Sequence, residues 1–143
     1  MVDKDIVQRK LSFIDLKLRN LETLKRMERQ DFLDSFQAVD AAKYNLQVCI
    51  EALIDISNHV VARERWGIPS TSAEAVKLLI KHGVLGKDKE LSLVQMVKFR
   101  NRIVHLYQEV DDSEIYRILQ ENLDDIKGFI QAMISMFFNS TPI

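Results

Sequence analysis

Arg100 and His105 are the two side chains whose chemistry and spacing stand out in this sequence. At roughly 100° per residue, Arg100 falls inside the apolar sector of the helix predicted around it. That sector is formed by Leu93, Met96, Val97, Ile103 and Val104. A guanidinium stays charged, so it needs an acidic or polar partner inside the protein, or a wet cleft that a phosphate can enter. The sequence leaves both alternatives open.

The composition indicates one soluble globular domain spanning residues 1–143. The chain is 47% apolar and 29% charged, which is ordinary for such a domain. It carries 20 Lys and Arg against 21 Asp and Glu, a net charge of −1. This balance excludes a protein that coats polyanions through its overall field, so any contact with nucleic acid must be local.

The cysteine content and the apolar runs restrict the class of protein further. Cys49 is the only cysteine, which excludes an intrachain disulfide and a thiol metal cluster, and we expect a buried structural thiol. Residues 1–11 are rich in charge, unlike a signal peptide, and the longest uncharged apolar stretch, 129–138, is too short to span a bilayer. We therefore expect a cytoplasmic protein without a membrane segment.

Periodic apolar residues predict helices throughout, and no alternating strand pattern competes with them. We expect a first helix around residues 7–21, a long second one capped by Asp31 and ending before Gly67, a short third one from Thr71 to Lys81, a fourth from Asp88 that holds Arg100, and a fifth from Asp111 to Phe137. Four main helices and one short helix, joined by brief loops, predict an all-α, up-and-down four-helix bundle with one additional short helix.

Arg100, four intervening residues, His105, one more and Tyr107 resemble the Arg-x4-His-x-Tyr signature of the HepT-type toxins in the HEPN superfamily. The likeness extends, in the same order along the chain, over residues 54–59 (IDISNH), 67–69 (GIP) and 81–85 (KHGVL). The resemblance implies a HEPN-like bundle that acts as a metal-independent endoribonuclease toxin, forms a homodimer and is paired with an MNT-type nucleotidyltransferase antitoxin. It implies no cofactor and no bound metal.

The chemistry that this resemblance implies needs few protein groups, because the 2′-hydroxyl of RNA can attack the adjacent phosphorus itself. Arg100 would stabilise the charge that develops on the phosphate oxygens. His105 would move a proton, as base or as acid, since an imidazole has a reference pKa of about 6.5. On an ideal helix these two side chains point about 140° apart. Their convergence therefore requires a distorted helix end or a cleft between two copies of the chain.

Four further residues receive supporting roles. Asn101 lies one turn before His105 and could orient its ring, and Arg102 would add positive charge for RNA binding beside Arg100. Tyr107, within the resemblance, could accept adenylyl groups from the partner enzyme, which would add bulk and negative charge where RNA should bind. Asp55 shares a helix face with His59 and is predicted to support the site.

Each role has a structural alternative. Arg100 could form an ion pair with a core carboxylate, with Asp55 as the candidate, and His105 could be a packing histidine. Asp55 and His59 could form a metal pair, an acid-base pair or a simple intrahelical hydrogen bond, although two ligands alone do not make a metal site. At the level of the whole protein, the alternatives are a non-catalytic HEPN subunit that binds nucleotide and partner, and a purely structural helical dimer.

Overall fold

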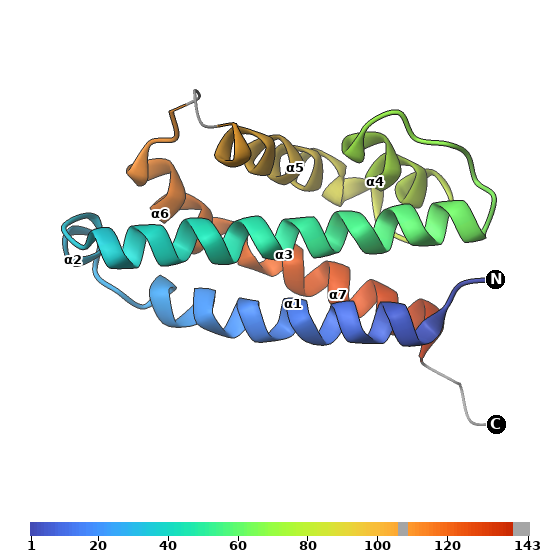
Figure 1. The fold of residues 1–143 in the computed structure, drawn as a ribbon, viewed down its shortest axis with the longest axis horizontal. Helices are drawn as coiled ribbons and strands as arrows, with labels where there is room; N and C mark the ends of the chain where they lie inside the picture. The colour runs from blue at the N-terminus through green and yellow to red at the C-terminus, as the bar shows by residue number, and fades with distance from the viewer. Residues whose placement is uncertain (106–108, 139–143) are drawn as a thin grey trace.

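The protein is all-α over the described part of the chain, as predicted. The computed structural model describes residues 1–105 and 109–138, and every regular element within them is a helix (Figure 1). The elements are α1 (Lys4–Lys25), α2 (Arg29–Leu33), α3 (Phe36–Arg63), α4 (Ser72–Lys81), the 3-10 turn η1 (Lys87–Lys89), α5 (Glu90–Val104), α6 (Asp112–Glu121) and α7 (Leu123–Phe137). Successive long helices, α1, α3, α5 and α7, run in alternating directions, so the up-and-down arrangement is confirmed (Figure 1).

Helix α1 packs along α3 through the stripe that its sequence predicts. The stripe residues Val7, Leu11, Ile14, Leu18 and Leu21 are all buried. The helix begins at Asp3, whose carboxylate accepts hydrogen bonds from the first backbone N–H groups. Opposite this stripe, Cys49 is buried and its Sγ lies 3.6 Å from the carbonyl oxygen of Ile14. Burial raises the pKa of this thiol to about 12, which confirms the predicted structural role.

The predicted second helix is in fact two helices, so Asp31 as its cap is wrong. Asp31 lies inside the one-and-a-half-turn helix α2, and Ser35 caps α3, its Oγ accepting a hydrogen bond of 3.1 Å from the N–H of Ala38. Phe32 explains the interruption, because its fully buried ring contacts the ring of Tyr116 on α6 with centroids 5.3 Å apart. Helix α3 keeps 28 residues and is about 42 Å long.

The third helix follows the prediction and the fourth departs from it at its start. The Thr71 side chain accepts from the N–H of Glu74, and Gly83, at φ +78°, ends α4 in the left-handed region. Asp88 does not cap the fourth helix. It lies inside the 3-10 turn that precedes α5.

The predicted fifth helix is also divided. Asp111 caps α6 as expected, its carboxylate accepting from the N–H of Ser113, but the chain bends at Asn122, which ends α6 and precedes α7. The Asn122 side chain donates to Asp125, a local bond that competes with a continuous helix. The bend lets α6 reach the α1–α2 corner, where Tyr116 donates to the carbonyl of Met27, while α7 packs along α1. None of the helices in the described ranges has both the length and the apolar character needed to cross a membrane.

Candidate active site

Arg100 lies on the side of α5 that faces α3, and 24% of its side chain is exposed. Its Nε is 4.0 Å from Oε1 of Glu51, and its Nη1 donates a 2.8 Å hydrogen bond to Oδ1 of Asn101. The Nε atom is itself buried and has no hydrogen-bond partner among the described residues. Arg100 therefore has one short hydrogen bond, to its neighbour in the sequence, and a longer ion pair across to α3, and its side chain remains partly exposed.

Glu51 is the acidic partner that sequence reasoning missed. Asp55 had been the candidate, but it forms an exposed ion pair with Lys10 of α1, with 3.2 Å between Nζ and Oδ2, so that assignment is wrong. Glu51 precedes Asp55 by one turn of α3 and also accepts a 2.8 Å hydrogen bond from Gln47. No local signal could have identified it, because the contact joins positions 49 apart in the sequence through the packing of α5 on α3.

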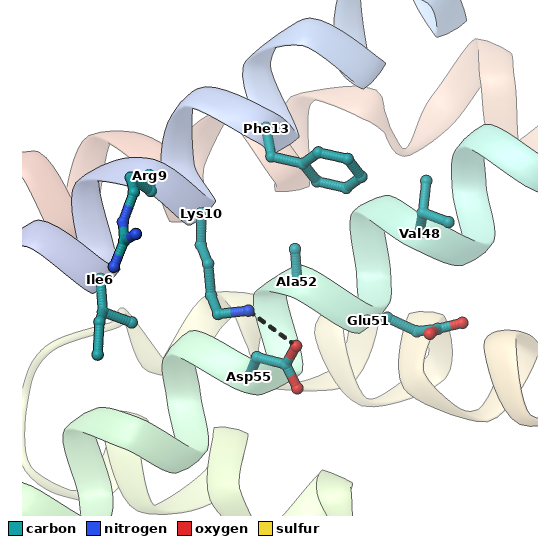
Figure 2. A pocket seen from close by; sticks show the side chains of 8 residues that line it. All are labelled: Ile6, Arg9, Lys10, Phe13, Val48, Glu51, Ala52 and Asp55. Atoms are coloured by element: carbon teal, nitrogen blue, oxygen red, sulfur yellow. Dashed lines mark hydrogen bonds and ion pairs between the residues drawn. The ribbon is translucent and has the colours of Figure 1, made fainter.

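A cavity of about 630 Å³ extends from Glu51 between α1 and α3 (Figure 2). Its lining residues are Ile6, Arg9, Lys10, Phe13, Val48, Glu51, Ala52 and Asp55. Figure 2 shows Lys10 reaching from α1 to Asp55, with Glu51 one turn earlier in α3. Cationic side chains thus come from α1 and carboxylates from α3. Because Glu51 belongs to this lining and also pairs with Arg100, the cavity and the arginine share one carboxylate.

His105 is the first residue beyond α5. The helix ends at Val104, and His105 has extended backbone angles, φ −91° and ψ 104°, while its N–H still bonds to the carbonyl of Asn101 at 3.3 Å. Its side chain is exposed. The helix end is therefore irregular at this position, so the 140° separation of an ideal helix does not apply to His105.

Two predicted supporting residues have different partners from those expected. The side-chain oxygen of Asn101 accepts from Arg100, so the amide orients the arginine. Arg102 lies on the opposite side of α5, where it forms a close ion pair with Glu114 of α6 and its guanidinium lies over the Phe99 ring, 5.7 Å from the centroid. The expected cluster of Arg100 and Arg102 around one cleft is therefore wrong for a single chain. Tyr107 lies outside the described residues.

Asp55 and His59 do not pair with each other. Asp55 binds Lys10, and Nε2 of His59 accepts a 3.0 Å hydrogen bond from the backbone N–H of Asp3. Desolvation, and to a smaller extent the charge of Arg63, lower the pKa of His59, which suits a ring nitrogen that accepts a hydrogen bond. Within residues 1–105 and 109–138, no group of three His, Cys, Asp or Glu side chains is placed to hold a metal ion.

Solved structures share this fold. The chain superimposes with a TM-score of 0.85 on the tri-AMPylated HEPN toxin of Shewanella oneidensis, solved in complex with an MNT antitoxin, at 30% identity and covering 92% of this chain and 98% of that one. The bundle is therefore a HEPN fold. Residues 14–133 match the family described as Ribonuclease HepT-like.

The sequence relatives agree with the structural one. The chain is 30% identical to the mRNA nuclease HepT of Shewanella oneidensis over 83% of this chain and 96% of that protein. It is 24% identical to the tRNA nuclease HepT of Aphanizomenon flos-aquae over 94% and 91% of the two chains. This chain belongs to the ribonuclease HepT-like family, which confirms the resemblance seen in its sequence.

Proposed function

We propose that this chain is the toxin of a toxin-antitoxin pair and is an endoribonuclease that cuts RNA without a metal through Arg100 and His105. The family match and the two nuclease relatives support the activity. The observation that carries the assignment of residues is the loose ion pair of Arg100. The contact between Arg100 and the Glu51 carboxylate is 4.0 Å long, and the short bond of the guanidinium goes to the neutral amide of Asn101, so no close carboxylate competes with an oxyanion for this side chain.

In the proposed reaction the 2′-oxygen forms a bond to phosphorus and the bond from phosphorus to the 5′-oxygen breaks. The products are a 2′,3′-cyclic phosphate and a 5′-hydroxyl. Arg100 stabilises the negative charge on the non-bridging oxygens, and His105 either takes the proton from the attacking 2′-hydroxyl or gives a proton to the departing 5′-oxygen. A single positioned acid or base contributes about 10²- to 10⁴-fold, so a second group or a second copy of the motif would add to the rate.

We also propose that the active form is a homodimer in which two copies of the motif line one groove. An apolar surface on the α1–α3 face, next to the cavity, supports this arrangement. Phe13 and Tyr44 are exposed there, and the ammonium of Lys17 lies 5.4 Å from the centroid of each ring. A groove between two copies would bring positive charge from both chains to the RNA, which a nearly neutral single chain lacks.

The proposed antitoxin is an MNT-type nucleotidyltransferase that modifies Tyr107. The tyrosine oxygen would bond to the α-phosphorus of ATP, pyrophosphate would leave, and the phenolic proton would pass to a base. Each adenylyl group would add a negative phosphate two residues from His105 and so oppose RNA binding. The AMPylated HEPN toxin of Shewanella oneidensis, solved with its MNT antitoxin, supports this proposal.

The test is cleavage of RNA in excess chelator by the unmodified protein, Arg100→Ala and His105→Ala. Arg19→Ala and His82→Ala are matched controls, because both residues are exposed, Arg19 lies on α1 and His82 directly follows α4. We expect cyclic-phosphate ends from the parent and both controls, and a loss of at least about 100-fold in the two motif variants. Cleavage that chelator abolishes, or equal cleavage by all five proteins, would contradict the proposal. Binding of the nucleotidyltransferase without any cleavage would favour the non-catalytic subunit.

A further inference from the structure

A second concave surface lies on the far side of α5 from Arg100. It is a groove of about 420 Å³ between α5 and α6, and neither Arg100 nor His105 is among its lining residues. Its apolar floor includes Met96, Phe99 and Ile118, each of which is largely buried. A volume of this size falls within the range of small-ligand sites and can hold one nucleotide unit. We call it the α5–α6 groove.

Charged side chains border this groove, and cations outnumber acids. Lys98, Arg102 and Arg117 line it together with a single carboxylate, Glu114. Glu114 is bound to Arg102, so this pair is neutral and holds α5 against α6. Two positive charges therefore remain in a protein whose net charge is −1.

Neither of the two remaining cations, Lys98 and Arg117, has a strong ion pair among the described residues. Lys98 is exposed and has no acidic group within 4.0 Å among the residues that the structure describes. Arg117 is paired only with Glu121, four positions on in the same helix, at 3.4 Å, and both side chains are more than half exposed. Exposed pairs of this kind contribute little, so a phosphate can compete for the arginine.

The groove also leads to the predicted catalytic histidine. Gln95, Lys98 and Arg102 are spaced by three and four positions, which places them on one face of α5. The helix ends two residues after Arg102, and His105 follows directly. Arg100 lies on the other side of the helix, toward Glu51. A strand that follows the groove toward the end of α5 therefore approaches His105.

We propose that the α5–α6 groove binds a nucleotide of the single-stranded RNA substrate next to the cleavage point, with its base over the apolar floor and its phosphate at Lys98 and Arg117. This inference rests on the proposed ribonuclease function. In this arrangement Lys98 and Arg117, rather than Arg102, contact the RNA phosphate, because Arg102 is already neutralised by Glu114. The combination of apolar floor and cationic rim matches a base and its phosphate.

The test compares the double variant Lys98→Gln/Arg117→Gln with the control Lys4→Gln/Arg19→Gln. The control removes the same two residue types from exposed positions on α1, and Arg19, like Arg117, pairs with an acid four positions away. Both doubles change the net charge equally. In cleavage of a short single-stranded RNA, we expect the groove variant to raise KM about tenfold with kcat within about twofold. The salt dependence of binding should fall by about 0.7 in log-log slope, because one phosphate contact is lost, and the control should leave both quantities at parental values.

A fully 2′-O-methylated RNA of the same sequence, which the proposed reaction cannot cut, measures the same contacts by fluorescence anisotropy. Failure of the parent to cleave RNA would overturn the proposed function, whereas the groove is still judged by this binding experiment. Equal KM, affinity and salt slope in the two double variants would overturn the groove proposal. So would a variant that binds RNA normally but loses affinity for the nucleotidyltransferase, since the groove would then be a protein interface. The double variant Lys98→Arg/Arg117→Lys keeps both positive charges, and a KM close to that of the parent would support the groove proposal.

Discussion

Arg100 and Arg102 are two positions apart on α5, yet they have opposite environments. Arg102 is bound closely to Glu114 and lies over the ring of Phe99, so its charge is neutralised within the fold. Arg100 faces a carboxylate at 4.0 Å and keeps a buried Nε without a hydrogen bond among the described residues. Two positions along a helix correspond to a rotation of about 200°, which is why consecutive arginines of one motif meet different helices.

This difference separates a structural arginine from one that is prepared for a ligand. A guanidinium with satisfied partners would have to break them before it could bind a phosphate, whereas one held at a distance needs only a small movement. The side chain best placed for chemistry is therefore the one with the poorer internal bonding. Because residue type and exposure alone do not distinguish the two arginines, this criterion depends on their partners.

The largest effect is expected from Arg100→Lys, which keeps the charge and removes the fork. A lysine cannot bridge two phosphate oxygens in the same way, so kcat for RNA cleavage should fall about 100-fold. Arg102→Lys is the matched control, and its effect on kcat should be far smaller. Single-turnover cleavage at saturating RNA measures both. Similar losses in the two variants would show that the two arginines do not differ in the proposed way.

A smaller effect is expected from Glu51→Gln, which keeps the side-chain shape and removes its charge. We expect kcat to fall about tenfold, equivalent to about 1.4 kcal/mol of barrier, because the guanidinium loses the carboxylate that directs it. The KM and the melting temperature should change little. Asp55→Asn is the control, since Asp55 lines the same cavity but binds Lys10. A change in stability with unchanged kcat would make Glu51 a structural partner only.

Sequence reasoning succeeded where the determinants are local. The apolar stripe of α1, the start of α4 at Thr71 and the start of α6 at Asp111 each depend on residues within a few positions. It failed where apolar periodicity continues across a break. The second predicted helix begins at Asp31, four residues before the cap at Ser35, and the apolar stripe of the fifth continues across Asn122, so the predictions join helices that local side-chain bonds separate.

The candidate site divides in the same way. Arg100 and His105 follow from motif spacing, and the partial burial of Arg100 agrees with its place in the apolar sector. Glu51 and Glu114, which decide the environments of the two arginines, come from other helices, and their pairings depend on helix packing. Charge alone assigns RNA binding to Arg102, and only the structure shows that this side chain has a carboxylate partner within the fold.

A double-mutant cycle on Arg102 and Glu114 tests the structural half of the comparison. Because 39% and 27% of the two side chains are exposed, solvent screening limits the expected coupling to about 1 kcal/mol in the free energy of unfolding. Urea unfolding of Arg102→Ala, Glu114→Ala and the double variant gives this value. The same cycle on Arg100 and Glu51 should give a smaller coupling. Equal or reversed couplings would contradict the contrast between a close and a loose ion pair.

The smallest effect is expected from a change at His59. We interpret His59 as a structural histidine, whereas His105 is the proposed catalytic one. Its pKa is lowered in the folded protein, chiefly by desolvation, and His59 is expected to be neutral where it accepts from Asp3. As pH falls below about 6.5, the pKa of a histidine in the unfolded chain, His59 takes up a proton in the unfolded state before it does so in the native state. The free energy of unfolding therefore decreases as pH falls through the lowered pKa of the native state. His59→Gln can still accept the hydrogen bond but cannot titrate, so it should reduce the difference in melting temperature between pH 7.5 and pH 5.5. Its pH profile of RNA cleavage should remain parental, because His59 takes no part in the proposed chemistry. An unchanged melting difference would show that His59 does not couple folding to pH, and an altered cleavage profile would place it in the active site.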